Sequence, residues 1–216
     1  MIHQKDSREE IIIFTRYPRA GMTKTRLIPE LGAEGAASIQ RSMTERIVGT
    51  AGRLIHEQGL CLWVYSVGGS LQLMKEWLGP DYFYHDQAEG DLGRKMMLAL
   101  RDARRRGAKR TVLIGSDCPG LTGGLLREAL EALQTSRLVL GPSADGGYYL
   151  IGAGSDLSEE ELSLLFTDIA WGTPGVFQET VARARTAGIT ISILTELRDI
   201  DHPQDLAYFD HHSDPQ

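Results

Sequence analysis

The sequence predicts an α/β protein in which one twisted, mostly parallel mixed sheet is covered by helices on both faces. Short apolar runs alternate along the chain with longer segments of helical periodicity, as in strands joined by crossover helices. One apolar segment, GYYLIG at 147–152, follows the preceding strand-like run too closely for a crossover, so at least one strand pair is antiparallel. No repeat or linker interrupts the pattern, which predicts a single domain over 9–210 behind a flexible tail at 1–8.

The expected strands are compact apolar or alternating runs bounded by polar residues, Gly or Pro. They cover 11–15, 60–67, 82–85, 111–115, 137–141, 147–152 and 189–194. The expected helices carry most of their apolar residues on one face. They cover 33–57, 71–78, 92–106, 123–134, 174–187 and a short segment after residue 203. Thr122 is the expected N-cap of one helix, and Thr173 followed by Pro174 is the expected start of another.

Composition limits the classes of partner. The 216-residue chain has a formal net charge of −6, which argues against a nucleic-acid binder because phosphate contacts need a basic face. Its two cysteines are too few for a disulfide framework, and the polar N-terminus lacks the apolar run of a signal peptide. The apolar runs are too short to span a bilayer. We therefore expect a cytoplasmic protein with small-molecule partners and without nucleic-acid or membrane partners; the oligomeric state is left open.

Polar motifs fall at the ends of predicted strands, where open α/β sheets bind ligands. The first, RYPRAGMTKTR at 16–26, follows the first strand and holds four cations. Gly21 permits close backbone approach, and Lys24 and Arg26, with Arg16, can neutralise phosphate oxygens. The glycine–lysine spacing differs from that of a P-loop, and a solvated basic loop is the alternative. Position and charge density favour a site for nucleotide phosphates.

The second motif is GSDCPG at 115–120, directly after another predicted strand. Asp117, beside a Pro-Gly turn, is well placed to hold a hard divalent cation, Mg²⁺ or Mn²⁺, together with nucleotide phosphates. Ser116 next to it is an expected nucleotide contact. An Asx-turn is the alternative interpretation of Asp117. Cys118 is disfavoured as a nucleophile because no histidine stands out as its partner.

A third motif lies between two predicted strands, where Asp145, Gly146 and Gly147 are typical of a tight hairpin turn. Its two glycines would also clear space for an acceptor substrate, so we assign all three residues to an acceptor site. Two single residues join the candidates. Gly93 could pack against a base or ribose, and Trp171 could line the acceptor pocket, although its segment also reads as the start of a helix.

The fourth motif follows the last predicted strand and holds Asp199 and Asp201. If that strand continues to residue 201, alternation places both carboxylates on one face. They could then join Asp117 in a carboxylate metal site. Helix capping ahead of Pro203 is the alternative interpretation.

Taken together, these motifs resemble a known family. They are FTRYPRAGMTKTRLIPELG, GDLGRKM, IGSDCPGLT, GPSADGGYYLIG, LFTDIAWGTPGV and LRDIDHPQDL, in that order over most of the chain. The set is similar to the bacterial rSAM/selenodomain-associated transferase 1 family, formerly a domain of unknown function. That family is assigned to the nucleotide-diphospho-sugar transferase superfamily, which has the GT-A fold, and its relatives include phospholactate guanylyltransferase.

The resemblance implies a GT-A fold and a nucleotide site built from the first loop. Lys24 and Arg26 would act there in catalysis by stabilising the departing pyrophosphate. The resemblance also implies Asp117 as the aspartate on the metal side, with Asp199 or Asp201 as a second metal contact.

Three functions fit these motifs. The favoured one is metal-dependent nucleotidyl transfer, in which a small phosphorylated acceptor attacks the α-phosphate of a nucleoside triphosphate and releases pyrophosphate. Glycosyl transfer from a nucleotide sugar is the first alternative, and a non-catalytic nucleotide-binding module is the second. The base and the acceptor are left open, since Arg94 stands where the family commonly has an acidic residue.

Overall fold

The computed structural model describes residues 9–211, so the tail expected at 1–8 lies outside the described residues. Seven strands form one sheet in the order β3-β2-β1-β4-β6-β5-β7. The strands are β1 (Glu9–Arg16), β2 (Cys61–Val67), β3 (Phe83–Asp86), β4 (Arg110–Gly115), β5 (Leu138–Pro142), β6 (Tyr148–Gly154) and β7 (Ile191–Ile193). Every expected strand is present, although β7 is only 3 residues long and ends earlier than expected.

The sheet is mixed, as the sequence predicts. β1 lies between β2 and β4 and is parallel to both, and the pairs β2–β3 and β5–β7 are parallel too. β6 is antiparallel to both of its neighbours, β4 and β5. The short connection explains this reversal: the amide of Gly146 donates to the carbonyl of Ser143 (2.9 Å) and closes a hairpin turn.

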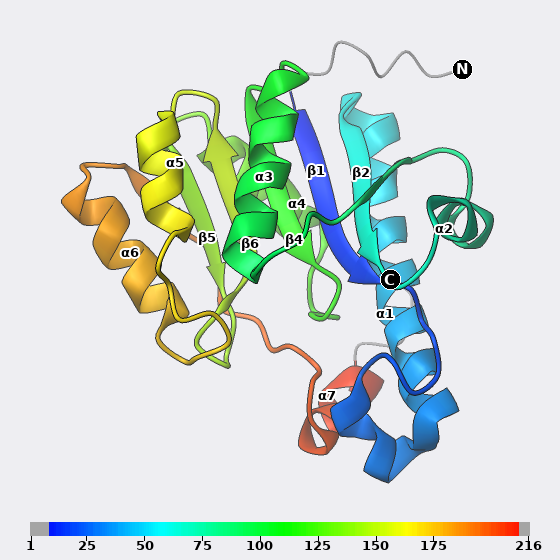
Figure 1. Cartoon of the computed structure of the whole chain (residues 1–216). Helices are drawn as coiled ribbons and strands as arrows, with labels where there is room; N and C mark the ends of the chain where they lie inside the picture. The colour runs from blue at the N-terminus through cyan, green and yellow to red at the C-terminus, as the bar shows by residue number, and fades with distance from the viewer. Residues whose placement is uncertain (1–8, 212–216) are drawn as a thin grey trace.

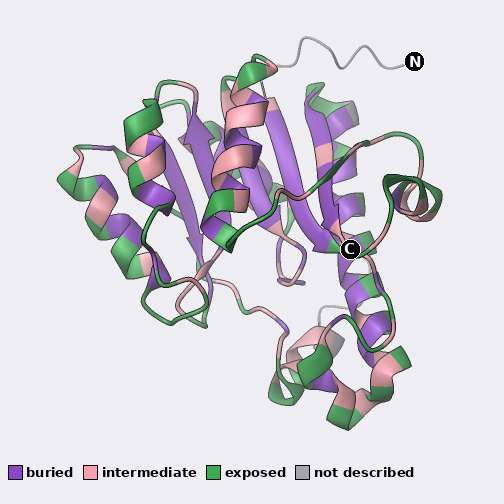
Figure 2. Ribbon diagram, viewed as in Figure 1, coloured by how far each residue is buried: buried purple, intermediate pink, exposed green. Residues whose placement is uncertain are grey.

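Helices cover both faces of the sheet (Figure 1). One face packs against α1 (Ile28–Gln58), α2 (Leu71–Leu78) and α4 (Gly123–Ala132), and the other against α3 (Leu92–Arg105), α5 (Glu159–Phe166) and α6 (Val176–Thr186). A last helix, α7 (Leu206–His211), follows a 3-10 turn. Because both faces are covered, the central strands are apolar on both sides and buried (Figure 2). Among the described residues, no helix combines the length and apolar character needed to cross a membrane.

Three helices differ from the sequence-based expectation. α5 is not anticipated, although Ser158 and Glu161 form a capping box at its start. α6 begins at Val176, later than expected, because the hydroxyl of Thr173 donates to a backbone carbonyl three residues earlier and caps no helix. α1 begins earlier than expected and bends at Gly32, whose φ of 69° is outside the helical region.

The parallel strands place four connections at one edge of the sheet. The carboxyl ends of β1, β2 and β4 lie there, and antiparallel β6 begins there (Figure 1). The loop after β1, the loop after β4, the β5–β6 turn and the segment after β7 therefore meet at this edge. All four polar motifs of the sequence lie in these connections.

Candidate functional site

A cavity of about 660 Å³ opens at this edge of the sheet. Most of the predicted site residues line it. They are Arg16, Lys24, Arg26, Ser116, Asp117, Asp145, Gly147, Trp171, Asp199 and Asp201. Gly21, Gly93 and Gly146 do not line it. The topology of the sheet, rather than closeness in the sequence, brings these side chains together.

Lys24 is at the centre of the charged part of the cavity. Its Nζ lies 2.8 Å from Asp117 Oδ1 and 3.7 Å from Asp201 Oδ1, and its side chain is only 6% exposed. Nζ also donates to the carbonyl of Ile200 at 2.6 Å. Burial opposes the charge of this ammonium, but the carboxylates of Asp117, Asp201 and Asp199 outweigh burial and raise the pKa of Lys24. Lys24 therefore ties the loops after β1, β4 and β7 to one another.

The backbone of Lys24 is in the left-handed region, with φ 46° and ψ 43°. Among residues 9–211, only Asp168 shares a positive φ without being glycine. Such a conformation costs about 1–3 kcal/mol and persists where the surroundings fix it. Here the ion pairs of Nζ hold the residue in place. Gly21, with φ 74°, gives the same loop a left-handed turn that glycine adopts without strain.

The two arginines of this motif that line the cavity are exposed. Arg26 forms an ion pair with Asp201, and its side chain is 63% exposed. Arg16 lies at the end of β1 and lines the cavity. No carboxylate of residues 9–211 lies within ion-pairing distance of Arg16. Its guanidinium is therefore the cation of the cavity that is most available to an anionic ligand.

Two further carboxylates, those of Asp145 and Asp199, also line the cavity. The hydroxyl of Ser143 hydrogen-bonds to Asp145 and lies 3.3 Å from Asp199 Oδ1. Asp145 Oδ1 also accepts the amide of Gly147 at 2.9 Å. Burial raises the pKa of Asp199, and the nearby charge of Asp145 raises it further. The hydrogen bond from Ser143 and the charge of Lys24 only partly offset this rise in the pKa of Asp199.

The predicted reason for the closeness of Asp199 and Asp201 is wrong, although both line the cavity. β7 ends at Ile193, so strand alternation does not extend to them. The segment is positioned instead by a hydrogen bond from the amide of Ile200 to the carbonyl of Asp117 at 2.9 Å.

Among residues 9–211, no three His, Cys, Asp or Glu side chains are grouped closely enough to hold a metal ion. The predicted cluster of Asp117, Asp199 and Asp201 is therefore not preassembled, because Lys24 lies between two of its members. Mg²⁺ in nucleotide sites commonly needs only one or two carboxylates, and phosphate oxygens and water complete its shell. A metal that is bound together with a nucleotide would therefore need only one or two of the carboxylates that line the cavity.

The remaining predicted residues shape the walls of the cavity. A Cβ at Gly93 would lie 2.4 Å from Nε1 of Trp171, so this glycine packs against the indole and does not face a ligand. A Cβ at Gly146, which has φ 89°, would lie 2.1 Å from the carbonyl oxygen of Pro174. Both glycines therefore permit close packing around the cavity. Trp171 lines the cavity, and its assignment to the acceptor stays a prediction.

Two glutamines that were not predicted as site residues also line the cavity. Gln40 Nε2 lies within hydrogen-bond distance of the hydroxyls of Thr15, Thr44 and Ser116, which joins α1 to the ends of β1 and β4. Gln87 Nε2 donates to two backbone carbonyls of β1 and β2. The polar pair at 40 and 44, one turn apart on a helix that faces the sheet, is the signal that could have revealed the first network.

Cys118 lines the cavity but is not suited to act as a nucleophile. Burial raises the pKa of its thiol well above the ordinary value, and Asp117 and Asp199 raise it further. The thiol is therefore protonated at neutral pH, and the thiolate is the reactive form. The burial of the thiol and the missing histidine partner therefore both disfavour Cys118 as a nucleophile.

Comparison with known proteins agrees with the fold. The sequence profile of DUF2064, described as "Uncharacterized protein conserved in bacteria", matches residues 50–173. No curated protein sequence matches the chain. A crystal structure from Desulfovibrio desulfuricans G20, provisionally described as a nucleotide-diphospho-sugar transferase, is 34% identical, with a TM-score of 0.87 over 94% of this chain and 86% of that one.

More distant structures share the fold alone. A CMP:2-keto-3-deoxy-manno-octonic acid synthetase complexed with CTP is 12% identical, with a TM-score of 0.60 over 95% of this chain and 98% of that one. The 4-diphosphocytidyl-2C-methyl-D-erythritol synthase of Anaerococcus prevotii DSM 20548 is 9% identical, with a TM-score of 0.62 over 95% and 96% of the two chains. The single α/β domain is thus that of nucleotidyltransferases and related GT-A-like proteins.

Proposed function

The chain belongs to the bacterial family DUF2064, and from this premise we propose that it is a metal-dependent nucleotidyltransferase. Its substrates would be a nucleoside triphosphate and a small phosphorylated acceptor. The observation that carries the proposal is the position of Lys24, whose Nζ lies 2.8 Å from Asp117 in a cavity that Arg16 and Arg26 also line. Cations beside carboxylates at the carboxyl edge of an α/β sheet suit a bound polyphosphate with a divalent metal.

In the proposed reaction, an ionised oxygen of the acceptor phosphate attacks the α-phosphorus of the triphosphate. The bond from that phosphorus to its bridging oxygen breaks, and pyrophosphate leaves with the electron pair. Arg16 and Arg26 would bind the departing phosphates, and Lys24 would exchange one carboxylate partner for a phosphate oxygen. Mg²⁺ (or Mn²⁺), held by Asp117 and Asp199 with phosphate oxygens, would neutralise part of the phosphate charge.

Glycosyl transfer from a nucleotide sugar is the second candidate. The description of the Desulfovibrio relative, 34% identical over most of both chains, favours it. Both reactions need a diphosphate site and a metal, so metal dependence does not separate them. They differ in the product that leaves: pyrophosphate in nucleotidyl transfer, and a nucleoside diphosphate in glycosyl transfer.

The test measures both products in parallel. The protein is incubated with Mg²⁺, each nucleoside triphosphate and a panel of phosphorylated acids and sugars, and pyrophosphate is assayed. Parallel reactions contain UDP- or GDP-sugars, and free nucleoside diphosphate is assayed. We expect pyrophosphate from one triphosphate in the presence of an acceptor. Nucleoside diphosphate release without pyrophosphate decides for glycosyl transfer, and thermal stabilisation by a nucleotide without either product decides for the non-catalytic module.

A further inference from the structure

The cavity extends along the edge of the sheet. It has a charged centre, and the two regions on either side of this centre differ in chemical character. The strand order places the end of β2 and the residues after β3 on one side of β1, and β4 followed by β6 on the other. The charged side chains of Lys24, Arg26 and Asp117 come from the loops after β1 and β4, between these two sides. A transferase must bind two substrates, and each side offers room for one.

The side next to β2 carries a hydrogen-bonding group of fixed orientation. Gln87 Nε2 donates to the backbone carbonyls of Thr15 and Tyr65, each at 3.1 Å. Both amide hydrogens are used in this way, which leaves Oε1 as an acceptor on a side chain that lines the cavity. Adenine, cytosine and guanine all carry amino donors on their edges. This side therefore suits a nucleobase.

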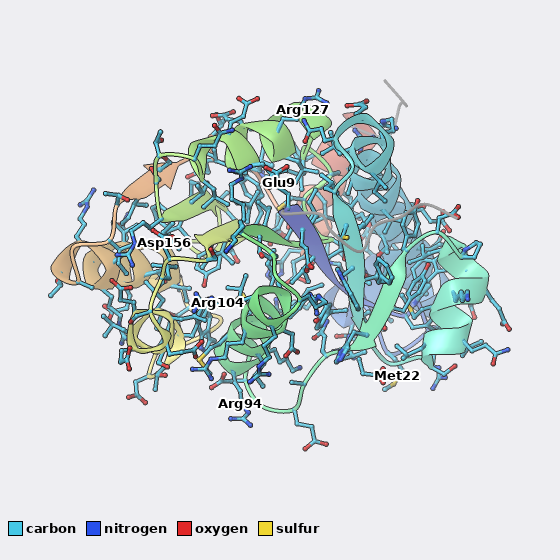
Figure 3. All side chains as sticks on the ribbon, turned by 90° about the horizontal axis from the view of Figure 1, so that it is seen from above. Glu9, Met22, Arg94, Arg104, Arg127 and Asp156 are labelled. Carbon is cyan, nitrogen blue, oxygen red and sulfur yellow. The ribbon has the colours of Figure 1, made fainter. Side chains whose placement is uncertain are left out.

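The opposite side, which we call the apolar lobe, is formed by side chains of α3, β6, the segment between α5 and α6, and the first residue of α6. They are Leu92, Met96, Tyr148, Ile151, Trp171 and Val176. None of the cavity-lining residues of these four parts of the chain is charged. Arg94, also on α3, points away from the sheet (Figure 3) and does not line the cavity.

The polar side-chain atoms of the apolar lobe are buried or already bonded. Nε1 of Trp171 and the hydroxyl of Tyr148 meet no hydrogen-bond partner among the described residues, but both atoms are buried, so neither is presented to a ligand in the lobe. Thr173, at the rim, donates its hydroxyl to the carbonyl of Ala170 at 2.8 Å. A ligand in this lobe would find almost no hydrogen-bonding partner for a hydroxyl of its own.

The wall of the lobe is rigid, and its surface is open. The indole of Trp171 stacks on Phe166, with ring centroids 6.2 Å apart, and meets the ring of Tyr148 edge-on at 6.3 Å. Gly93 supports the indole from the α3 side. Leu92, one residue earlier, is 47% exposed although it is a large apolar side chain. Such a preorganised aromatic surface with an exposed neighbour suits an apolar ligand.

We propose that the acceptor carries an apolar body, alkyl or aromatic, which packs in the apolar lobe while its reacting oxygen lies at the charged centre. This inference rests on the proposed function and narrows its acceptor class. A sugar in the lobe would exchange hydrogen bonds with water for contacts that cannot replace them, which is unfavourable for each hydroxyl that is buried. An apolar ring of the same size would gain from the burial of its surface.

The experiment compares two phosphate esters of similar size, cyclohexyl phosphate and glucose 1-phosphate. Inorganic phosphate serves as the reference for binding at the charged centre alone. Dissociation constants are measured by calorimetry with Mg²⁺ and the nucleoside triphosphate that binds best, for the full chain and two variants. Leu92→Ser removes an exposed apolar contact of the lobe. Leu164→Ser is the matched control, because Leu164 is 42% exposed and does not line the cavity.

We expect cyclohexyl phosphate to bind at least tenfold more tightly than glucose 1-phosphate. Leu92→Ser should weaken the binding of cyclohexyl phosphate by about fourfold, the equivalent of one buried methylene. It should leave the binding of inorganic phosphate unchanged. Leu164→Ser should change neither. Equal or tighter binding of glucose 1-phosphate overturns the inference, as does an equal loss for cyclohexyl phosphate and inorganic phosphate in Leu92→Ser.

The assay of products separates this inference from the function on which it rests. Pyrophosphate formed with glucose 1-phosphate but not with cyclohexyl phosphate would support the function and refute the apolar acceptor. Selective binding of cyclohexyl phosphate without pyrophosphate from any triphosphate would support the apolar lobe as a binding site for an apolar body and refute nucleotidyl transfer.

Discussion

Two ion pairs, each with one deeply buried member, lie at opposite ends of β1, and one of them faces the cavity of the candidate site. At the amino end, Arg106 binds Glu10 through two nitrogens, at 2.6 and 3.2 Å, and its guanidinium lies 3.9 Å from the ring centroid of Trp63. At the carboxyl end, Lys24 pairs with Asp117, whose side chain is 48% exposed. The first pair is largely enclosed by protein, so we expect it to contribute to the stability of the fold. The second has an exposed partner, so a ligand can replace one of its contacts.

The largest effect should follow from breaking the enclosed pair. Arg106→Leu leaves Glu10, with a side chain only 4% exposed, without its partner, and we expect the free energy of unfolding to fall by about 3–5 kcal/mol. Urea denaturation measures it. Arg127→Leu is the control, since its pair with Glu57 is exposed and is worth about 0–1 kcal/mol. Similar losses in both variants would contradict the structural role of the enclosed pair.

Breaking the pair at the cavity should affect ligand binding more than stability. Lys24→Asn removes the ammonium and keeps a residue type that tolerates a left-handed backbone. We expect triphosphate affinity to fall by about 1.5–3 kcal/mol, the worth of a charge-assisted contact, with nucleoside affinity unchanged. Calorimetric titration with both ligands tests it, and Lys75→Met on α2 is the control. Equal losses for triphosphate and nucleoside would exclude a phosphate contact.

A smaller effect should follow from Asp117→Asn, which keeps the shape of the side chain and removes its charge. We expect the gain in triphosphate affinity on adding Mg²⁺ to shrink by about tenfold, as for the loss of one charged contact. Metal-free binding should not weaken, because Lys24 is released from its ion pair. Asp156→Asn, which lies outside the cavity, is the control. An unchanged response to Mg²⁺ would argue against Asp117 as a metal ligand.

The smallest effect is a pH dependence of the enclosed pair. Burial raises the pKa of Glu10 above its ordinary value of 4.5, and Arg106 only partly opposes this. The stability that Glu10 contributes is therefore present below pH 4.5 and is lost as the pH rises through the raised pKa. The difference in unfolding free energy between the parent and Glu10→Gln should shrink over that window. Denaturation at a series of pH values measures it, and a constant difference would refute the shift.

The sequence predicts strands better than it predicts contacts between distant loops. Compact apolar runs identified each strand, and the short connection before Tyr148 identified the antiparallel one. Helix α5 was missed because its apolar face is brief, although Ser158 and Glu161 mark its start. Lys24 and Asp117 were both identified as site residues, but their ion pair depends on β1 and β4 being neighbours in the sheet. Local patterns carry no information about that order.

The contact between Gly93 and Trp171 has a consequence for how relatives of this protein diverge. Even a methyl group at position 93 would overlap the indole, so the two positions cannot vary independently. A family member with a side chain at 93 should carry a smaller residue at 171, and its lobe would have a different shape. One codon change on α3, at a residue that does not itself line the cavity, would thus alter which acceptors are admitted, while the charged centre stays as it is.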